Sequence, residues 1–467
     1  MTDKAIRVFE IGSDDFAAFQ KRIAARAERG DVPLGGAPME YLARARASGD
    51  GELIAWAEQF YEGLPSMAEA TVERVIQRVA EQGDRALCML TRLFDDFPLT
   101  QNRILVAPAD LQKLAAQADP AALKTCKEDV LPRLKRFHAR QKLESFDIEE
   151  AGGSVGSRVQ PLQRVALYVP GGKAFYPSTL MMTAVPAQVA GVREIAVFTP
   201  PGALEKTPLM AALLLELGLT EVYRVGGAQA VAAAAFGTGK IPKVHKVVGP
   251  GNIFVALAKR LLYGQVDIDS IAGPSEIVVL FDRSAKPRHV AADLLAQAEH
   301  DEHAAAIGVT DDAAAAQAVQ EEVEKQLTAL PRKDIARSSL TSFGGLLVVP
   351  SMNFGVRFVD SLAPEHVEVI TAHSEEHAAA IRHAGAIFIG PFAPEAFGDY
   401  CAGPNHVLPT SGTATWACAL SVYDFVRHVS IIRGSREMLA ASRKAITTLA
   451  RTEGLEAHAR SVDVRFE

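Results

Sequence analysis

Short, almost continuous apolar runs alternate with helical stretches from about residue 165 to residue 390. Several runs carry β-branched residues on both faces, as strands of a parallel sheet covered by helices do. This alternation predicts βαβ units and an α/β fold with two Rossmann-like, doubly wound domains. The runs are VALYV (165–169), EIAVFT (194–199), EVYRV (221–225), HKVVG (245–249), EIVVLF (276–281), GLLVVP (345–350), VEVIT (367–371) and AIFIG (386–390).

The segments that flank these runs have helical periodicity. Residues 1–63 contain polar helical stretches such as FAAFQKRIAARAERG, broken by GDVPLGGAP, and we expect a small helical N-terminal arm there. From about residue 421 the chain returns to a helical pattern, in REMLAASRKAITTLARTEGLEAHARS. A helix is also predicted from Ser66 to Gly83, where one face collects Val72, Val75, Ile76 and Val79.

Three junctions between a predicted strand and a predicted helix are rich in glycine. They read YVPGGKAFYPS, VGGAQAVAAAAFGTG and VGPGNIFVALAKR. Glycine lets the backbone approach a ligand closely, and a helix N-terminus favours an anion, so we expect dinucleotide binding through Tyr168, Gln229 and Asn252. None of the loops is a GxGxxG, and tight turns in an ordinary α/β protein are the alternative explanation.

These patterns predict a chain of four units. The expected ranges are 1–63 for the N-terminal helical arm, 64–164 and 275–420 for a main α/β domain, 165–274 for an inserted Rossmann-like nucleotide-binding domain, and 421–467 for a C-terminal helical tail. The main domain is expected to carry metal-binding and acid/base residues.

Composition narrows the class of protein. The 467 residues are 48% hydrophobic and 22% charged, which is typical of globular proteins, with a formal net charge of −7. That charge argues against nucleic acid or an anionic membrane as the main partner. No run of 18 apolar residues and no signal peptide is present, and the four cysteines lack CxxC spacing. We therefore expect a cytoplasmic protein without a thiolate metal site.

Polar islands in the second half of the chain offer nitrogen and oxygen ligands for a metal. Gln297 and His300 are three residues apart in QAEH, Asp399 lies in GDYCAGPNH, and His458 lies in EGLEAH. Such a donor set could hold zinc, but manganese or cobalt would also be acceptable. A solvated helix end, a turn and a surface histidine are the respective structural alternatives.

A second group of polar residues has the character of an acid/base site. Glu365 and His366 follow a proline and precede the strand VEVIT, and a histidine near its ordinary pKa is a competent base at neutral pH. His406 and Glu453 have a similar status. Each of these residues could instead belong to an ordinary polar surface loop.

Eight ordered motifs together resemble the histidinol dehydrogenase family, from about Glu69 to the C-terminus. They are RVALYVPGGKAFYPSTLMM, VGGAQAVAA, GPGN, AGPSE, DLLAQAEHD, APEHVEV, GDYCAGPNHVLPT and EGLEAHARSV. The resemblance implies one Zn²⁺ per subunit, bound by Gln297, His300, Asp399 and His458. It also implies an acid/base pair of Glu365 and His366, and NAD contacts at Tyr168, Gln229 and Asn252. The substrate contacts that it implies are Ser275, Gln297, His300, His366, Asp399, His406, Glu453 and His458.

The implied reaction is the oxidation of L-histidinol through L-histidinal to L-histidine with two NAD reduced, the last steps of histidine biosynthesis. Members are homodimers with intertwined subunits, so residues 421–467 would be a dimerisation tail and would bring Glu453 and His458 to the partner's site. Three alternatives stay open. They are a paralogous NAD-dependent dehydrogenase for another hydroxylated substrate such as a dihydroxypropanesulfonate, a zinc hydrolase without a dinucleotide, and a binding protein with a structural metal.

Overall fold

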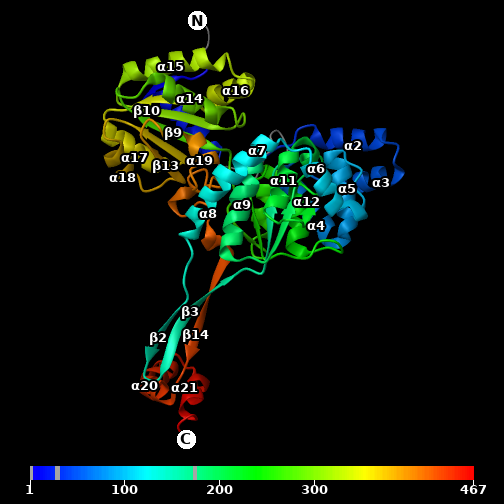
Figure 1. Ribbon diagram of the computed structural model, residues 1–467, viewed down its shortest axis with the longest axis vertical. Helices are drawn as coiled ribbons and strands as arrows, with labels where there is room; N and C mark the ends of the chain where they lie inside the picture. The colour runs from blue at the N-terminus through cyan, green and yellow to red at the C-terminus, as the bar shows by residue number, and fades with distance from the viewer. Residues whose placement is uncertain (1–3, 27–31, 172–175) are drawn as a thin grey trace.

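The computed structural model describes residues 4–26, 32–171 and 176–467. It has two α/β lobes side by side and a long projection that carries the C-terminal helices away from both (Figure 1). The prediction of an α/β fold with two parallel, helix-covered sheets is confirmed. Part of the first glycine loop, residues 172–175, lies outside the described residues.

The first lobe is built on a five-stranded parallel sheet in the order β6-β5-β4-β7-β8. The strands are β4 (Arg164–Tyr168), β5 (Glu194–Phe198), β6 (Val222–Tyr223), β7 (Lys246–Val248) and β8 (Asp267–Ile268). The helices of this lobe are α2 (Ala37–Ala47), α3 (Gly51–Tyr61), α4 (Ala68–Gln82), α5 (Asp84–Asp95), α6 (Pro108–Ala115), α7 (Pro120–Thr125), α8 (Leu131–Ala139), α9 (Pro177–Ala190), α10 (Ala203–Lys206), α11 (Pro208–Glu216), α12 (Gly227–Phe236) and α13 (Ile253–Leu262).

The second lobe is built on a six-stranded parallel sheet in the order β1-β11-β10-β9-β12-β13. The strands are β1 (Val8–Glu10), β9 (Glu276–Phe281), β10 (Ala305–Thr310), β11 (Gly345–Val348), β12 (His366–Ile370) and β13 (Ala386–Ile389). The helices are α1 (Asp14–Ala25), α14 (Pro287–Ala298), α15 (Ala313–Leu327), α16 (Lys333–Phe343), α17 (Met352–Leu362), α18 (Ser374–Ala380) and α19 (Glu395–Tyr400). Separate apolar cores lie on the two faces, one with α14, α15 and α16 and the other with α1 and α17.

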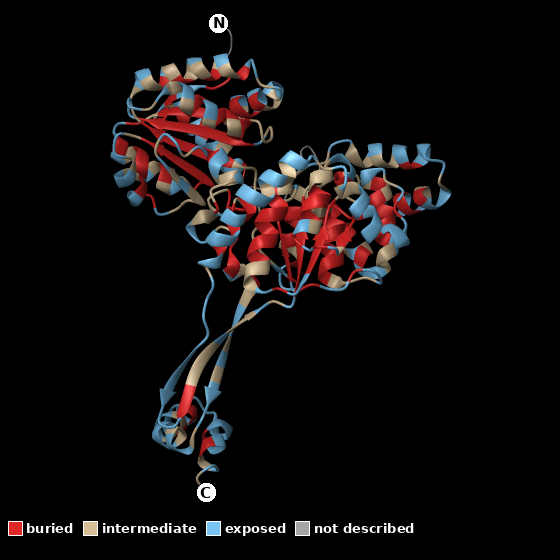
Figure 2. Cartoon of the chain, viewed as in Figure 1, coloured by how far each residue is buried: buried red, intermediate tan, exposed pale blue. Residues whose placement is uncertain are grey.

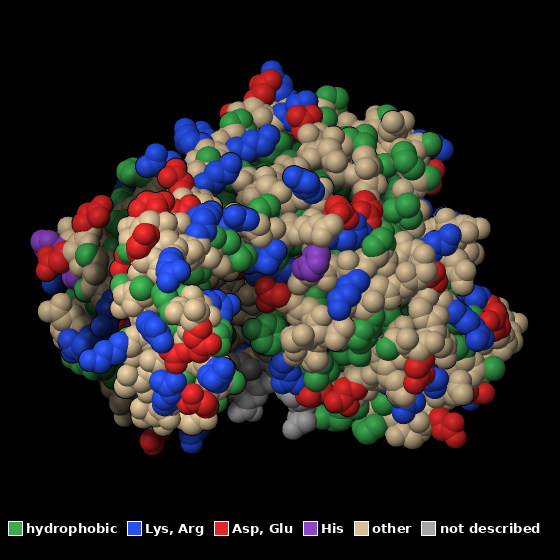
Figure 3. All heavy atoms as spheres, turned by 90° about the horizontal axis from the view of Figure 1, so that it is seen from below, with side chains coloured by type: hydrophobic (Ala, Val, Ile, Leu, Met, Phe, Trp, Pro, Cys, Tyr) green, Lys and Arg blue, Asp and Glu red, His purple; other side chains and the backbone are tan. Residues whose placement is uncertain are grey.

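The projection is an antiparallel sheet in the order β14-β3-β2, and its far end carries α20 and α21. Its elements are β2 (Phe146–Glu150), β3 (Gly153–Pro161), β14 (Val426–Arg433), α20 (Arg436–Thr452) and α21 (Glu456–Asp463). The sheet is mostly exposed or half-buried, in contrast to the buried strands of both lobes (Figure 2). Seen from this end, the surface mixes Lys and Arg with Asp and Glu (Figure 3).

The predicted domain ranges differ from this arrangement in three places. Residues 1–63 do not form one arm, because β1 pairs with β11 in the second lobe while α2 and α3 contribute to the core of the first. Residues 64–164 do not join 275–420, because α4 and α5 share a core with α12 and α13. The tail from 421 is not wholly helical, since it contains β14, which pairs with β3 along its whole length.

The eight predicted strands are all present within a few residues of the expected bounds. The predicted helix ends at Gln82, and Gly83 takes a φ of +52°. Within the described residues, no helix is both long and apolar enough to cross a membrane.

The loop after β7 contains a glycine that no other residue can replace without movement of the backbone. Gly249 has a φ of +117°, and a Cβ there would lie 2.2 Å from the carbonyl oxygen of Tyr168. Its N–H donates to Asp269, and its carbonyl accepts from Lys259, which is buried in an ion pair with Asp269. The glycine therefore lets the loop after β7 pack directly against the end of β4.

We expect Gly249→Ala to lower the free energy of unfolding more than Gly264→Ala does. Gly264 also has a positive φ, +97°, but nothing lies within 4 Å of its Cβ position. Left-handed strain alone costs about 1–2 kcal/mol, and the clash at Gly249 adds about 1–3 kcal/mol. Urea titrations of both variants measure the difference, and equal losses would contradict the clash.

Candidate active site

One cavity of about 840 Å³ lies between the two lobes. The carboxyl ends of β4, β6 and β7 face it from the five-stranded sheet, and the amino ends of β9 and β12 face it from the six-stranded sheet. Its size is within the usual range for pockets that bind small molecules and cofactors. Nine residues singled out in the sequence line it: Tyr168, Gln229, Asn252, Ser275, His300, Glu365, His366, Asp399 and His406.

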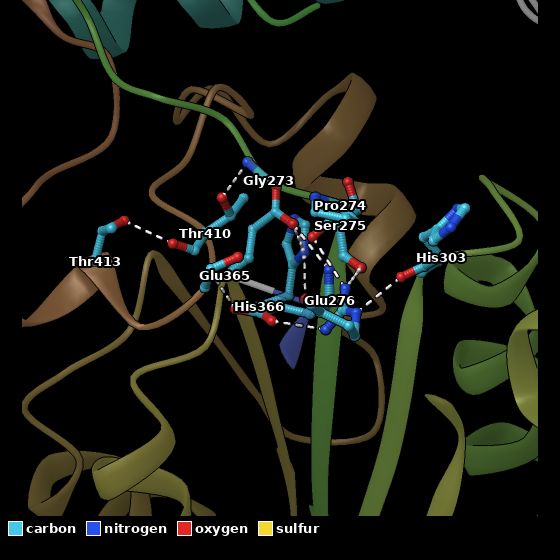
Figure 4. Close-up of polar contacts among 12 residues, drawn as sticks. Gly273, Pro274, Ser275, Glu276, His303, Glu365, His366, Thr410 and Thr413 are labelled. Carbon is cyan, nitrogen blue, oxygen red and sulfur yellow. Dashed lines mark hydrogen bonds and ion pairs between the residues drawn. The ribbon is translucent and has the colours of Figure 1, made fainter. Parts of the chain in front are cut away.

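The predicted acid/base residues are held by the backbone of the neighbouring strand (Figure 4). The N–H of Glu276, the first residue of β9, donates to Glu365 Oε2 at 3.0 Å. The carbonyl of the same residue accepts a hydrogen bond from His366 Nδ1 at 3.1 Å. Because a carbonyl can only accept, Nδ1 carries the proton and the neutral ring has its free lone pair on Nε2. That Nε2 is buried without a hydrogen-bond partner among the described residues.

Burial perturbs both predicted acid/base groups. Desolvation raises the pKa of Glu365 well above its ordinary value, and the nearby carboxylates of Glu276 and Asp399 raise it further. Desolvation lowers the pKa of His366 to about 3, and His300 and His406 contribute in the same direction. Paired groups with shifts of this kind, in a cavity, are characteristic of acid/base sites. The imidazole is therefore neutral at neutral pH, with its Nε2 lone pair unprotonated.

Two of the four predicted metal ligands, His300 and Asp399, come together with a second carboxylate, Glu395. One ligand atom from each of His300, Asp399 and Glu395 lies within 4.8 Å of the others. Both side-chain polar atoms of Gln297, which is fully buried at the end of α14, lack a hydrogen-bond partner among the described residues. A buried amide without partners is costly, and a metal ion or ligand would satisfy it. The residues present fit a metal with nitrogen and oxygen ligands.

His406 is placed beside these groups by α19. Its Nδ1–H donates to the carbonyl of Asp399 at 3.0 Å, and its Nε2 lies 3.5 Å from Thr179 Oγ1 of α9. Burial lowers the pKa of His406 to about 4. Asp399 itself lies in the short helix α19, which residues 395–400 form.

The predicted cofactor residues lie at the first lobe's end of the cavity. Tyr168 ends β4, and its hydroxyl accepts the N–H of Gly227 at 3.0 Å. Gln229 is buried in the first turn of α12. Asn252 caps α13, since its side-chain oxygen accepts the N–H groups of Phe254 and Val255. The cap uses the side-chain oxygen of Asn252, so its amide NH₂ is the group left for a ligand at this end of α13.

Two predicted site residues lie elsewhere in the chain. Glu453 and His458 belong to the region of α20 and α21, at the far end of the projection, and both are exposed. Neither lines the cavity. Within one chain they do not meet the other predicted ligands.

Three carboxylate-bearing positions of the site were missed in the sequence. Glu276 follows Ser275 in AGPSE, Glu395 precedes Asp399 by four residues, and Asp95 ends α5 beside Tyr168 in the cavity wall. The spacing of Glu395 and Asp399, one helical turn, was the only signal for their proximity. Burial raises the pKa of Asp95 to about 6.

The fold and the cavity define a two-lobed α/β protein in which a buried Glu–His pair, a cluster of candidate metal ligands and glycine loops surround one pocket. A family model described as histidinol dehydrogenase matches residues 63–466. The chain belongs to the histidinol dehydrogenase family.

Individual relatives agree with this placement. The histidinol dehydrogenase of Halalkalibacterium halodurans is 48% identical over 405 residues, which cover 86% of this chain and 94% of the relative. That of Syntrophotalea carbinolica is 47% identical over 418 residues, 89% of this chain and 96% of the relative. The crystal structure of histidinol dehydrogenase from Elizabethkingia anophelis superposes with a TM-score of 0.85 at 29% identity, and covers 100% of this chain and 99% of that one.

A buried carboxyl cluster behind the site gives a pH-dependent stability. Glu368 of β12 accepts the N–H of Glu395 at 2.6 Å, and burial together with Asp293 raises its pKa from 4.5 to about 9. The folded protein keeps this proton while the unfolded chain releases it above pH 4.5. The stabilisation is therefore complete below pH 4.5 and is lost as the pH rises through about 9.

We expect the free energy of unfolding to fall more steeply between pH 5 and pH 9 in the wild type than in Glu368→Gln. The amide keeps the acceptor for the Glu395 N–H but does not titrate. The slopes differ by at most about 1.4 kcal/mol per pH unit, the value for one proton. Urea titrations across this range measure it, and parallel curves would show that Glu368 does not hold a proton in the folded state.

Proposed function

We propose that the protein is a zinc-dependent, NAD-linked dehydrogenase that oxidises L-histidinol through L-histidinal to L-histidine. The observation that carries the proposal is the pair Glu365–His366, held by one backbone residue at a cavity that also collects His300, Asp399 and the glycine loops. The relatives that match along nearly their whole length are named histidinol dehydrogenase. Cytoplasmic histidine biosynthesis is the corresponding cellular role.

The first oxidation needs a base for the hydroxyl proton. His366 supplies it at Nε2, which is buried, unprotonated and without a hydrogen-bond partner among the described residues. As the ring becomes charged, its Nδ1–H keeps the bond to the Glu276 carbonyl, and Asp399 Oδ1, 3.8 Å from Nε2, stabilises the charge. Bound zinc would polarise the substrate and NAD would accept the hydride.

The second oxidation needs a water added to the aldehyde. Glu365 is placed to take a proton from that water, because its side chain lines the cavity beside Ser275. The Glu276 N–H holds one of its two carboxyl oxygens in place. Its raised pKa makes the ionised carboxylate a stronger base than one in water. The enclosed position also keeps the aldehyde from release between the two steps.

The proposed ligands are Gln297, His300 and Asp399 from one subunit and His458 from the partner. In this arrangement Glu453, five residues before His458, would contact the substrate imidazole. The exposed position of both residues at the end of the projection supports delivery to a second copy of the chain. Homodimerisation with intertwined subunits is thus part of the proposal.

The reaction stoichiometry tests the proposed activity directly. We expect two NADH per L-histidinol consumed by the purified protein with zinc and excess NAD, measured at 340 nm against histidine formed. One NADH with accumulated aldehyde would remove the role assigned to Glu365. No NADH from histidinol, with metal bound and the fold intact, would point to a related dehydrogenase with another hydroxylated substrate.

Mixing two inactive variants tests the shared site. Glu365→Gln and His458→Ala are each expected to lose activity as homodimers. A mixed dimer restores one intact site, with Glu365 from one chain and His458 from the other. A statistical mixture should recover about a quarter of wild-type turnover, since half of the dimers are mixed and each has one intact site.

The control is the double variant Glu365→Gln/His458→Ala mixed with either single variant. No such mixture contains an intact site, so subunit exchange alone restores nothing. The variants are mixed after partial denaturation and refolded together. Mixtures that stay inactive although mixed dimers are isolated would contradict a site completed by the partner.

A further inference from the structure

Arg26, a residue far from the site in sequence, contacts the start of β9. Arg26 follows α1 directly, at the end of the helix, and its side chain is only 2% exposed. It precedes the part of the chain that the family model matches, residues 63–466. The proposed chemistry does not use Arg26. Burial of a full positive charge is costly unless groups near the site compensate for it.

Each of the three guanidinium nitrogens of Arg26 donates a hydrogen bond to residues 274–276 or to His303. Nη2 donates to the carbonyls of Pro274 and Ser275 at 3.1 and 3.0 Å, and Nη1 donates to Glu276 Oε2 at 3.1 Å. Nε donates to the carbonyl of His303 at 2.8 Å. The planar guanidinium thereby joins the loop before β9 to the loop that follows His300.

Glu276 contacts Arg26 through its side chain and the Glu365–His366 pair through its backbone. Its side chain is fixed at both oxygens, by Arg26 at Oε2 and by the N–H of Ser411 at Oε1 (2.8 Å). Its backbone N–H and carbonyl are the groups that hold Glu365 and His366. Figure 4 shows Glu276, Glu365 and His366 gathered at the start of β9. A displaced Glu276 would therefore move both acid/base side chains together.

Charge gives a second reason for a cation at this position. Glu276 and Glu365 are both buried, and their mutual repulsion destabilises the ionised state of either one. Arg26 is the cation that contacts Glu276, and its field also reaches Glu365. Without it, a buried carboxylate would lose its partner, which is strongly unfavourable.

We propose that Arg26 is a positioning residue for the Glu365–His366 pair, which it orients through Glu276 and the carbonyls of Pro274 and Ser275. Arg26 does not line the cavity. Its effect on turnover rests on the proposed function, whereas its effect on the geometry at Glu276 does not.

The test compares Arg26→Ala and Arg26→Lys with a matched control, Arg22→Ala. Arg22 lies one turn earlier on α1 and donates to the carbonyl of Ser342, far along the chain from the start of β9. We expect Arg26→Ala to lower kcat about 10- to 100-fold, as for a misplaced catalytic group, with KM for histidinol and NAD changed less than about threefold. Arg22→Ala should keep kcat within about twofold.

Two further results separate positioning from a general loss of structure. Added guanidinium should restore part of the turnover of Arg26→Ala but none in Arg22→Ala. Arg26→Lys keeps the charge and loses the planar fork, so it should fold even if Arg26→Ala does not, and should still show a reduced kcat. A wild-type kcat in either Arg26 variant, or a loss equal to that of Arg22→Ala, would overturn the proposal.

Hydrogen–deuterium exchange of the whole protein without substrate provides the independent readout. The Glu276 amide, which donates to Glu365, should exchange faster in both Arg26 variants than in the wild type or Arg22→Ala. If the wild type fails to oxidise histidinol, the proposed function fails, and this measurement still decides the role of Arg26. Unchanged exchange at Glu276 would overturn that role.

Discussion

The site depends on the backbone of a single residue at the start of β9. Glu276 gives its N–H to Glu365 and its carbonyl to His366, so the two neighbouring side chains of β12 are fixed by one peptide segment. Parallel pairing of β9 with β12, with Ile277 opposite His366, brings these groups into reach. Strand register therefore sets the tautomer of the imidazole as well as the position of the carboxyl.

The cavity joins opposite edges of two parallel sheets. Loops at the carboxyl ends of β4, β6 and β7 present glycines and helix N-termini, which suit a phosphate-bearing cofactor. The amino ends of β9 and β12 present side chains that change protonation, in a setting where burial shifts their pKa values. In the proposed function, cofactor binding and proton transfer are thus divided between the lobes, and the relative placement of the lobes decides whether both can act on one substrate.

The sequence predicted most of the buried strands and nine of the residues that line the cavity, because both follow from local pattern and ordered motifs. It missed β10, whose sequence AAIGVT mixes two alanines and a glycine with its β-branched residues. It read β14 as part of a helical tail because VRHVSIIR is mostly exposed on both faces. Domain boundaries were wrong wherever distant segments pair, as β1 does with β11. Glu276, Glu395 and Arg26 were missed because their role comes from tertiary neighbours that no local spacing encodes.

The sheet of the projection buries little apolar surface within one chain. β2, β3 and β14 have few buried positions, and large apolar side chains such as Ile148 and Ile432 remain exposed. A three-stranded sheet without a covered apolar face gains little free energy from burial. The projection also carries Glu453 and His458. In the second lobe, the buried polar atoms of Gln297 lack hydrogen-bond partners among the described residues. A second chain that covers the projection would bury this apolar surface, and a histidine it delivers to the lobe's ligand cluster would add a nitrogen donor beside His300 and Asp399.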